Sequence, residues 1–423
     1  MMAASAGLCY AAVMLPPHVP SPSAAEAAAL APLAGASAAM LAQVEAWAAI
    51  NSGSRNLVGL DAMAAALLAA VSPLGGAATL VEAAPVDSVD AAGRTVPQPH
   101  GRNLHVVKRP DAPVRVLLTG HMDTVFGADH PFQALRWLDA DTLNGPGVAD
   151  MKGGIAVMLA ALAALEASPF AAHIGWEIVI NSDEEVSSPG STPLLVAAAQ
   201  RCHLGLTFEP ALPDGTLAGA RKGSGNFSAI VTGRAAHAGR EPENGRNALL
   251  AAADLALRLK ALTAADLTVN PARIDGGGPN NIVPDHAVLR WNMRASTPEA
   301  AARVRADIDA LTAETAAAHD VAIHVHGHFT RPPKPLDANQ LRLFELVRDC
   351  GAALGLTVAW RDTGGVCDGN NLAATGLAVV DTLGPRGGAI HSADEFLCVG
   401  SLVERAQLAA LVLMRVAQSG WTR

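Results

Sequence analysis

The segment LLTGHMDTVFG, residues 117–127, carries an apolar run directly into His121 and places Asp123 two positions later. The run over residues 114–119 has the length and composition of a strand that is buried on both faces of a parallel sheet. Three later segments share this pattern, at residues 174–181, 204–208 and 377–382. In an open parallel sheet, ligands bind outside the carboxyl ends of the strands. The polar residues that follow these segments are therefore candidates for a functional site.

An Ala/Leu-rich helical pattern over residues 153–167 lies between the first two predicted strands. Strand, helix and strand at this spacing predict an α/β fold with a mostly parallel sheet. A second helical pattern covers residues 39–71, with a Ser-Gly-Ser break before a helix that starts at Leu60. We expect these helices to cover the sheet.

The middle of the chain follows the order βαββαβ, which predicts an inserted ferredoxin-like unit. Its elements are expected at residues 226–233, 247–262, 267–274, 287–294, 298–318 and 321–328. Prolines at 332, 333 and 335 mark the exit from this unit. We therefore expect a catalytic domain over residues 39–219 and 335–423 and an inserted domain over residues 220–334. The Ala/Pro-rich residues 1–38 are interpreted as a flexible tail, or as an extension ahead of a true start near Met40.

Length and composition narrow the class of protein. A chain of 423 residues exceeds the usual size of a single core, which favours two domains. The net charge of −9 and the lack of any basic run argue against nucleic acid or an anionic membrane as partner, so a small solute is the expected ligand. Five scattered cysteines without CxxC spacing fit reduced thiols. A signal peptide requires a positively charged N-terminal region, but no Lys or Arg precedes Arg55. A cytoplasmic location is therefore expected.

Imidazoles and carboxylates follow the predicted strands repeatedly. They are His121, Asp123, Asp150, Asp183, Glu184, Glu185, Glu209 and His391. Each has an ordinary structural explanation: Asp150 could cap the following helix, for example, and adjacent acids are usually a solvated turn. At one sheet edge, however, these carboxylates cannot all be ionised unless a cation offsets their repulsion. Their joint placement favours a pair of metal ions.

The ligand types narrow the metal. Imidazole and carboxylate without thiolate suit Zn²⁺, with Co²⁺ or Mn²⁺ as substitutes, whereas Mg²⁺ would favour oxygen alone. Two such ions about 3.5 Å apart would activate a shared water and polarise a carbonyl oxygen. Hydrolysis of an amide or an ester is the expected reaction.

At this point the sequence resembles the M20 metallopeptidases. The matching motifs are TGHMDTV (119–125), NGPGVADMKGG (144–154), INSDEEVSSPGS (180–191), FEPA (208–211), GRAAHAG (233–239), PNNIVPDHA (279–287) and HSADEF (391–396). The motifs span the chain from about residue 39 to the C-terminus. The sequence most resembles the glutamate carboxypeptidase branch, because Glu209 stands where many deacylase relatives carry Asp.

The resemblance implies a set of metal ligands. His121 and Glu209 would hold one zinc, Glu185 and His391 would hold the other, and Asp150 would bridge the two.

Further roles follow from the same resemblance. Asp123 would orient the His121 ring, and Glu184 would be the general base. The peptide bond after Asp150 is expected to be cis.

The inserted domain resembles the dimerisation lid of this family. His237 would reach the active site of a partner subunit and stabilise the oxyanion, and Asn281 and Arg294 would bind substrate, with Arg294 clamping a carboxylate. A homodimer through the lid is therefore expected. The run IHVHGH at residues 323–328 places three histidines on one strand face, where an exposed face is favoured over a second metal site.

The leading hypothesis is a di-zinc hydrolase that releases a C-terminal amino acid, with glutamate favoured, from a peptidyl or N-acyl substrate. An N-acyl amino acid deacylase, a desuccinylase or an aromatic amidohydrolase would share every catalytic residue. A non-catalytic binding protein on this fold is the remote alternative.

Overall fold

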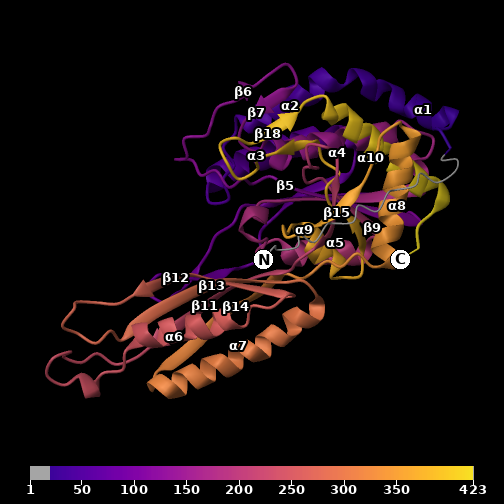
Figure 1. The fold of residues 1–423 in the computed structure, drawn as a ribbon. Coiled ribbons are helices and arrows are strands. Elements are labelled where there is room, and N and C mark those ends of the chain that lie inside the picture. The colour runs from indigo at the N-terminus through magenta and orange to yellow at the C-terminus, as the bar shows by residue number, and fades with distance from the viewer. Residues whose placement is uncertain (1–19, 423) are drawn as a thin grey trace, which may run out of the picture.

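The computed structural model describes residues 20–422, as a larger α/β domain and a narrower domain that projects from it (Figure 1). The six strands of the central sheet are ordered β1 (Ala77–Val81), β4 (Asn103–Lys108), β8 (Ile174–Asn181), β5 (Val114–His121), β9 (Leu204–Thr207) and β16 (Ala378–Val380). The last four run parallel; β4 is antiparallel to β8, and β1 is antiparallel to β4 and so runs in the direction of the other four. The predicted α/β fold with a mostly parallel sheet is confirmed.

Helices cover both faces of this sheet, as the unbroken apolar strands require. Along β5, Val116 and Leu118 belong to the main core, whereas Leu117 points to a smaller core on the opposite face. The helices of the main core are α2 (Ser37–Ala48), α3 (Leu57–Val71), α4 (Gly154–Glu166), α8 (Ala338–Ala353) and α10 (Ser401–Ser419). The opposite face carries α5 (Thr192–Arg201) and α9 (Asp368–Ala373).

The chain ahead of α2 corrects the predicted flexible tail. Helix α1 (Ala24–Leu30) begins with a capping box between Ser23 and Glu26 and continues into a short turn, η1 (Ala31–Gly35). Leu30 and Leu33 are buried in the main core. The tail prediction is therefore wrong from α1 onward, because the Ala-rich segment gains a buried apolar face against α10. Residues 1–19 of the predicted tail lie outside the described residues.

The inserted domain is the predicted βαββαβ unit. Its elements are β11 (Ser224–Thr232), α6 (Ala248–Ala261), β12 (Leu267–Gly276), β13 (His286–Ala295), α7 (Pro298–His319) and β14 (Ala322–Arg331). The four strands form an antiparallel sheet in the order β12, β13, β11, β14. Both helices cover one face of this sheet (Figure 1). We call this unit the lid.

Smaller elements complete the catalytic domain. A hairpin pairs β2 (Asp87–Val89) with β3 (Thr95–Pro97), and a second small sheet joins β17 (Gly387–Gly388), β18 (Phe396–Cys398), β7 (Thr142–Asn144) and β6 (Arg136–Trp137). A parallel two-stranded ribbon pairs β10 (Leu217–Arg221) with β15 (Trp360–Thr363). Short helical turns are η2 (Ser72–Leu74), η3 (Val148–Gly153), η4 (Ala171–His173), η5 (Glu184–Val186) and η6 (Pro242–Asn244).

Two helical segments of the described chain, Leu57–Leu74 and Val148–Glu166, are long and apolar enough to cross a membrane by length and composition. The second is 89% buried inside the protein, where it packs against α10. The first is 33% buried and directs Leu60, Met63 and Leu67 into the main core. Packing in the catalytic domain therefore uses the apolar side chains of both.

The histidine run lies on β14, where His324 and His328 are exposed. Within residues 20–422, the groups of His, Cys, Asp and Glu that are close enough to hold a metal do not include these histidines. The exposed strand face is therefore the interpretation that we keep.

Candidate metal centre

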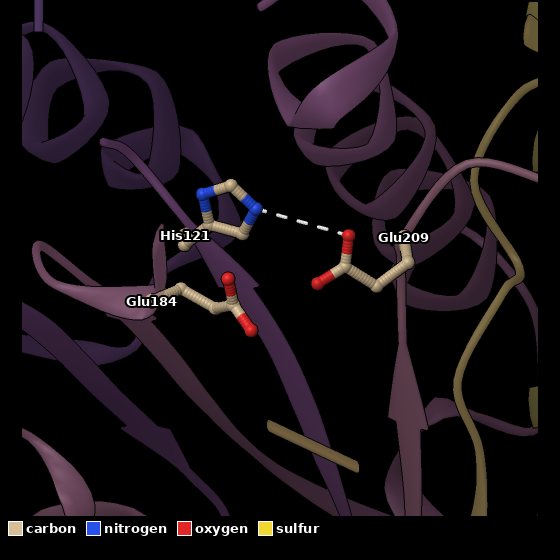
Figure 2. A group of neighbouring side chains, drawn as sticks. All are labelled: His121, Glu184 and Glu209. Carbon is tan, nitrogen blue, oxygen red and sulfur yellow. Dashed lines mark ion pairs between the residues drawn. The ribbon is translucent and has the colours of Figure 1, made fainter. Parts of the chain in front are cut away.

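The predicted ligands converge at the carboxyl edge of the central sheet. His121 is the last residue of β5, Glu184 and Glu185 follow β8, and Glu209 follows β9. Figure 2 shows His121, Glu184 and Glu209 pointing toward one another from these three strand ends. Asp150 enters from η3, and His391 comes from the loop between β17 and β18.

Asp150 lies between the two imidazoles. Its Oδ1 is 3.0 Å from Nε2 of His121, and its Oδ2 is 3.3 Å from Nε2 of His391. Each oxygen of one carboxylate thus faces a different imidazole. This arrangement suits a carboxylate shared by two cations.

Each imidazole also has its own glutamate. The distance from His121 Nε2 to Glu209 Oε2 is 3.7 Å, drawn as the dashed line in Figure 2, and that from His391 Nε2 to Glu185 Oε2 is 3.0 Å. The two pairs flank Asp150 in the grouping that the resemblance implies. The distances show that the ligands are brought together, while their roles stay predictions.

Two overlapping groups of residues could each hold a metal ion, because the ligand atoms inside each group all lie within 4.8 Å of one another. One group is His121, Glu184 and Glu209, and the other is His121, Asp150 and Glu185. Glu184 is thus close enough to be a ligand itself. Its carboxylate is also tied to Arg331, whose Nη2 lies 2.7 Å from Glu184 Oε1. The two His–Glu pairs and Asp150 form a ligand set without Glu184, so its predicted role as the base stays a prediction.

Arg331 is a residue of the site that the sequence interpretation missed. It is the last residue of the lid strand β14, is 1% exposed, and donates to the Glu184 carboxylate and main-chain oxygen. Its other terminal nitrogen bonds Asp368, so the guanidinium joins the lid exit to the catalytic domain. The sequence offered one signal for Arg331, its position directly before the Pro332–Pro333 pair. Its partners could not be predicted, because they are far away in the sequence.

Asp123 has several hydrogen-bonding partners. The His121 Nδ1 is 3.0 Å from the Asp123 main-chain oxygen and 3.3 Å from its Oδ1. The same carboxylate accepts the main-chain N–H groups of Glu184 and Glu185 and the hydroxyl of Ser54. Asp123 therefore links the end of β5, which carries His121, to the turn η5, which carries the glutamates.

Glu395 is a second residue that was missed, although it lies inside the closing motif. Its buried carboxylate accepts the N–H groups of Gly147, Ala149 and Asp150 at 3.0 to 3.1 Å. These bonds fix the loop that presents Asp150. The expected cis peptide bond between Asp150 and Met151 is present.

Burial disfavours the charged forms of the carboxylates in the cluster. Burial raises the pKa of Glu184 and Glu209, and it raises that of Glu185 to about 7. Burial opposes protonation of His121, yet the charge of Glu209 and hydrogen bonds to carboxylates outweigh it and raise the pKa of the imidazole. A bound cation would relieve the repulsion among these carboxylates.

A cavity of about 470 Å³ opens onto this cluster. Asp150, Glu184, Glu209 and His391 line one part of it. The predicted substrate-binding residue Arg294 also lines the cavity, and its Nη1 donates to the Gly364 carbonyl at 2.9 Å. One lid residue is therefore already at the site within a single chain.

The other two predicted lid residues lie elsewhere. His237 and Asn281 are exposed residues of neighbouring lid loops, and neither lines the cavity. The His237 Nδ1 accepts the N–H groups of Gly239 and Arg240. The described part of one chain does not bring these two side chains to the cluster.

A model of peptidase family M20/M25/M40 matches residues 117–415, and the chain belongs to this family. It is a peptidase or amidohydrolase of the M20 type.

Among its relatives, carboxypeptidase G2 from Pseudomonas sp. (strain RS-16) is 31% identical over 317 residues, which cover 71% of this chain and 73% of that protein. Succinyl-diaminopimelate desuccinylase from Gluconobacter oxydans is 29% identical over 311 residues, or 68% of this chain and 78% of that protein. A dinuclear metal-binding peptidase of family M20 from Bacillus subtilis has the same fold, with a TM-score of 0.64 at 14% identity over 91% of this chain and 99% of that chain.

Proposed function

We propose that the protein is a di-zinc amidohydrolase that releases a C-terminal amino acid, glutamate in the first instance, from a peptidyl or N-acyl substrate. The observation that carries this proposal is the position of Asp150 between two imidazoles, each with its own glutamate. Family membership and the likeness to carboxypeptidase G2 support the reaction class.

The ligand set fits zinc. Five nitrogen and oxygen ligands from His121, Asp150, Glu185, Glu209 and His391 surround the site, without a thiolate among them. When bound, two such cations would lower the pKa of a shared water and polarise the substrate carbonyl. Co²⁺ or Mn²⁺ would fit the same ligands.

The residues around the ligands have separate tasks. Glu184 takes a proton from the attacking water and passes it to the leaving nitrogen. Arg331 holds one of its oxygens, so the other is directed to the reacting atoms. Asp123 fixes the ring orientation of His121.

The lid would complete the site in a homodimer. Arg294 binds the α-carboxylate of the substrate, which needs the paired donors of a guanidinium. His237 and Asn281 belong, in this proposal, to the active site of the partner subunit, where His237 stabilises the developing oxyanion. Their exposure and their distance from the cavity of their own chain support this assignment.

A deacylase or desuccinylase is the second candidate. The likeness to succinyl-diaminopimelate desuccinylase favours it, and it would use the same ligands and the same base.

The test is amine release by zinc-loaded protein from N-acyl amino acids and from dipeptides that end in glutamate, aspartate or an apolar residue. Selective release of glutamate is expected. Activity confined to simple acetyl or succinyl substrates would replace the proposal with the second candidate, and silence across the panel would contradict both.

A further inference from the structure

Three arginines line the cavity beside the carboxylates of the metal cluster. Besides Arg294, its wall includes Arg221 and Arg361. Resting on the proposed function, we infer that Arg221 and Arg361 form a second anion subsite, which binds the side-chain carboxylate of the released residue. The substrate class is then an amide of an acidic amino acid.

The two arginines are placed by the β10/β15 ribbon. In the parallel register Ala218 pairs with Arg361, and Arg221 pairs with Thr363. The two arginines are thus offset by about two residues along the ribbon, roughly 7 Å, which two long side chains can bridge to reach one carboxylate. Because successive side chains of a strand alternate, Arg361 and Thr363 share one face, and both line the cavity.

Arg361 has no ion-pair partner within the described residues. The adjacent acid, Asp362, is turned to the ribbon, where its Oδ1 accepts the Ala220 N–H at 2.9 Å. Asp214 is close enough to be affected by the charge of Arg361, but it is exposed and does not line the cavity. A free guanidinium in a cavity wall is available for a ligand.

Arg221 belongs to a buried cluster with Asp381 and Lys334, and the charge of Glu209 also acts on it. Its Nε lies 2.7 Å from Asp381 Oδ2, and the same oxygen accepts Lys334 Nζ at 2.9 Å. Two buried cations therefore share the Asp381 carboxylate, so part of the Arg221 guanidinium is left without a direct ion pair. Nε and Nη2 of Arg221 bind Asp381, which leaves Nη1 for a ligand. This Nη1 lies beside Gly365, a residue of the cavity wall, since a Cβ atom placed on Gly365 would be 3.6 Å from it.

The charges separate two tasks within one site. Arg294, from the lid, would bind the carboxylate that every C-terminal residue has. Arg221 and Arg361, from the catalytic domain, would bind a carboxylate that only an acidic residue has. Selectivity for acidic over neutral residues should therefore depend on the ribbon and not on the lid.

The test compares N-acyl glutamate with N-acyl glutamine, because this pair differs by one charge at nearly constant shape. In Arg361→Met, which keeps an apolar stem, kcat/KM for the glutamate substrate should fall on the order of tenfold, with little change for glutamine. Arg136→Met, an exposed arginine on β6 outside the cavity wall, is the matched control and should change neither. Equal losses for both substrates, or no loss, would overturn the subsite.

Binding of free glutamate, measured by calorimetry on the same zinc-loaded variants, separates this inference from the proposed function. Hydrolysis without a preference for glutamate over glutamine would overturn the subsite and leave the function standing. Glutamate binding that weakens about tenfold in Arg361→Met, without hydrolysis of any substrate, would support the subsite and contradict the function. Arg221→Met tests the buried arginine of the subsite. Lys334→Met is the variant to compare with it, because it leaves the pair of Arg221 with Asp381 in place.

Discussion

In the catalytic domain, the side chains of His121, Asp150, Glu185 and Glu209 are at most one tenth exposed and each pairs with a predicted ligand, whereas His237 on the lid is an exposed loop residue. The first group is arranged before any substrate arrives. The second makes hydrogen bonds only within its own loop. A single chain therefore brings the predicted ligands together with Arg294 of its own lid, whereas the contribution of His237 through a partner subunit stays part of the proposal.

Asp150→Ala should have the largest effect, because it removes the carboxylate that faces both imidazoles. Both metals should be lost together and activity should fall to background. Metal content measured by mass spectrometry after gel filtration checks this. Asp394→Ala, an exposed acid near His391, is the control and should keep both ions. Retention of one equivalent by the Asp150 variant would refute the bridging role.

Glu184→Ala should separate chemistry from metal binding. The variant should keep its fold and both metals, while kcat falls about 10³-fold, as expected for the loss of a general base. Turnover numbers measured beside metal content check this. Turnover near that of the wild type would remove the assignment of the base.

His237→Ala should lower kcat by about 10²-fold, as the loss of an oxyanion donor does. Mixing this variant with Glu184→Ala tests sharing directly, since each mixed dimer would contain one intact site. With random exchange, activity should return to about a quarter of the wild-type value in a symmetric dimer. If mixed dimers form and stay inactive, the lid does not act across subunits.

A charge remote from the site should have the smallest effect. Burial alone would raise the pKa of Glu166, but hydrogen bonds from Arg109, Lys108 and Trp176 outweigh it and lower this pKa to about 2. The interactions of the Glu166 carboxylate with these partners therefore contribute to the free energy of unfolding above the unfolded pKa of about 4.5. This contribution is lost as pH falls toward 2.

Glu166→Gln should accordingly cost about 1 kcal/mol at pH 6 and progressively less below pH 4.5. Urea titrations of metal-free protein measure this, and kcat at neutral pH should be unchanged. A destabilisation that stays constant from pH 6 to pH 3 would show that packing, not charge, is responsible.

Much of this arrangement could be predicted from the sequence, because apolar strands and the polar residues after them are local patterns. The strand that ends at His121 and the lid elements were expected where they occur. The helix at 24–30 was not, since an Ala-rich segment has little periodicity and its partner α10 lies almost 400 residues away. The positions of Arg331 and Glu395 in the site were not predicted for the same reason, because their partners are set by tertiary packing and leave no local pattern in the sequence.

The most direct test of the metal centre is a crystal structure of the zinc-loaded protein with anomalous data at the zinc edge. The proposal predicts two peaks per subunit, one between His121 and Glu209 and the other between His391 and Glu185, with Asp150 between them. A single peak, or a second peak away from Asp150, would contradict it.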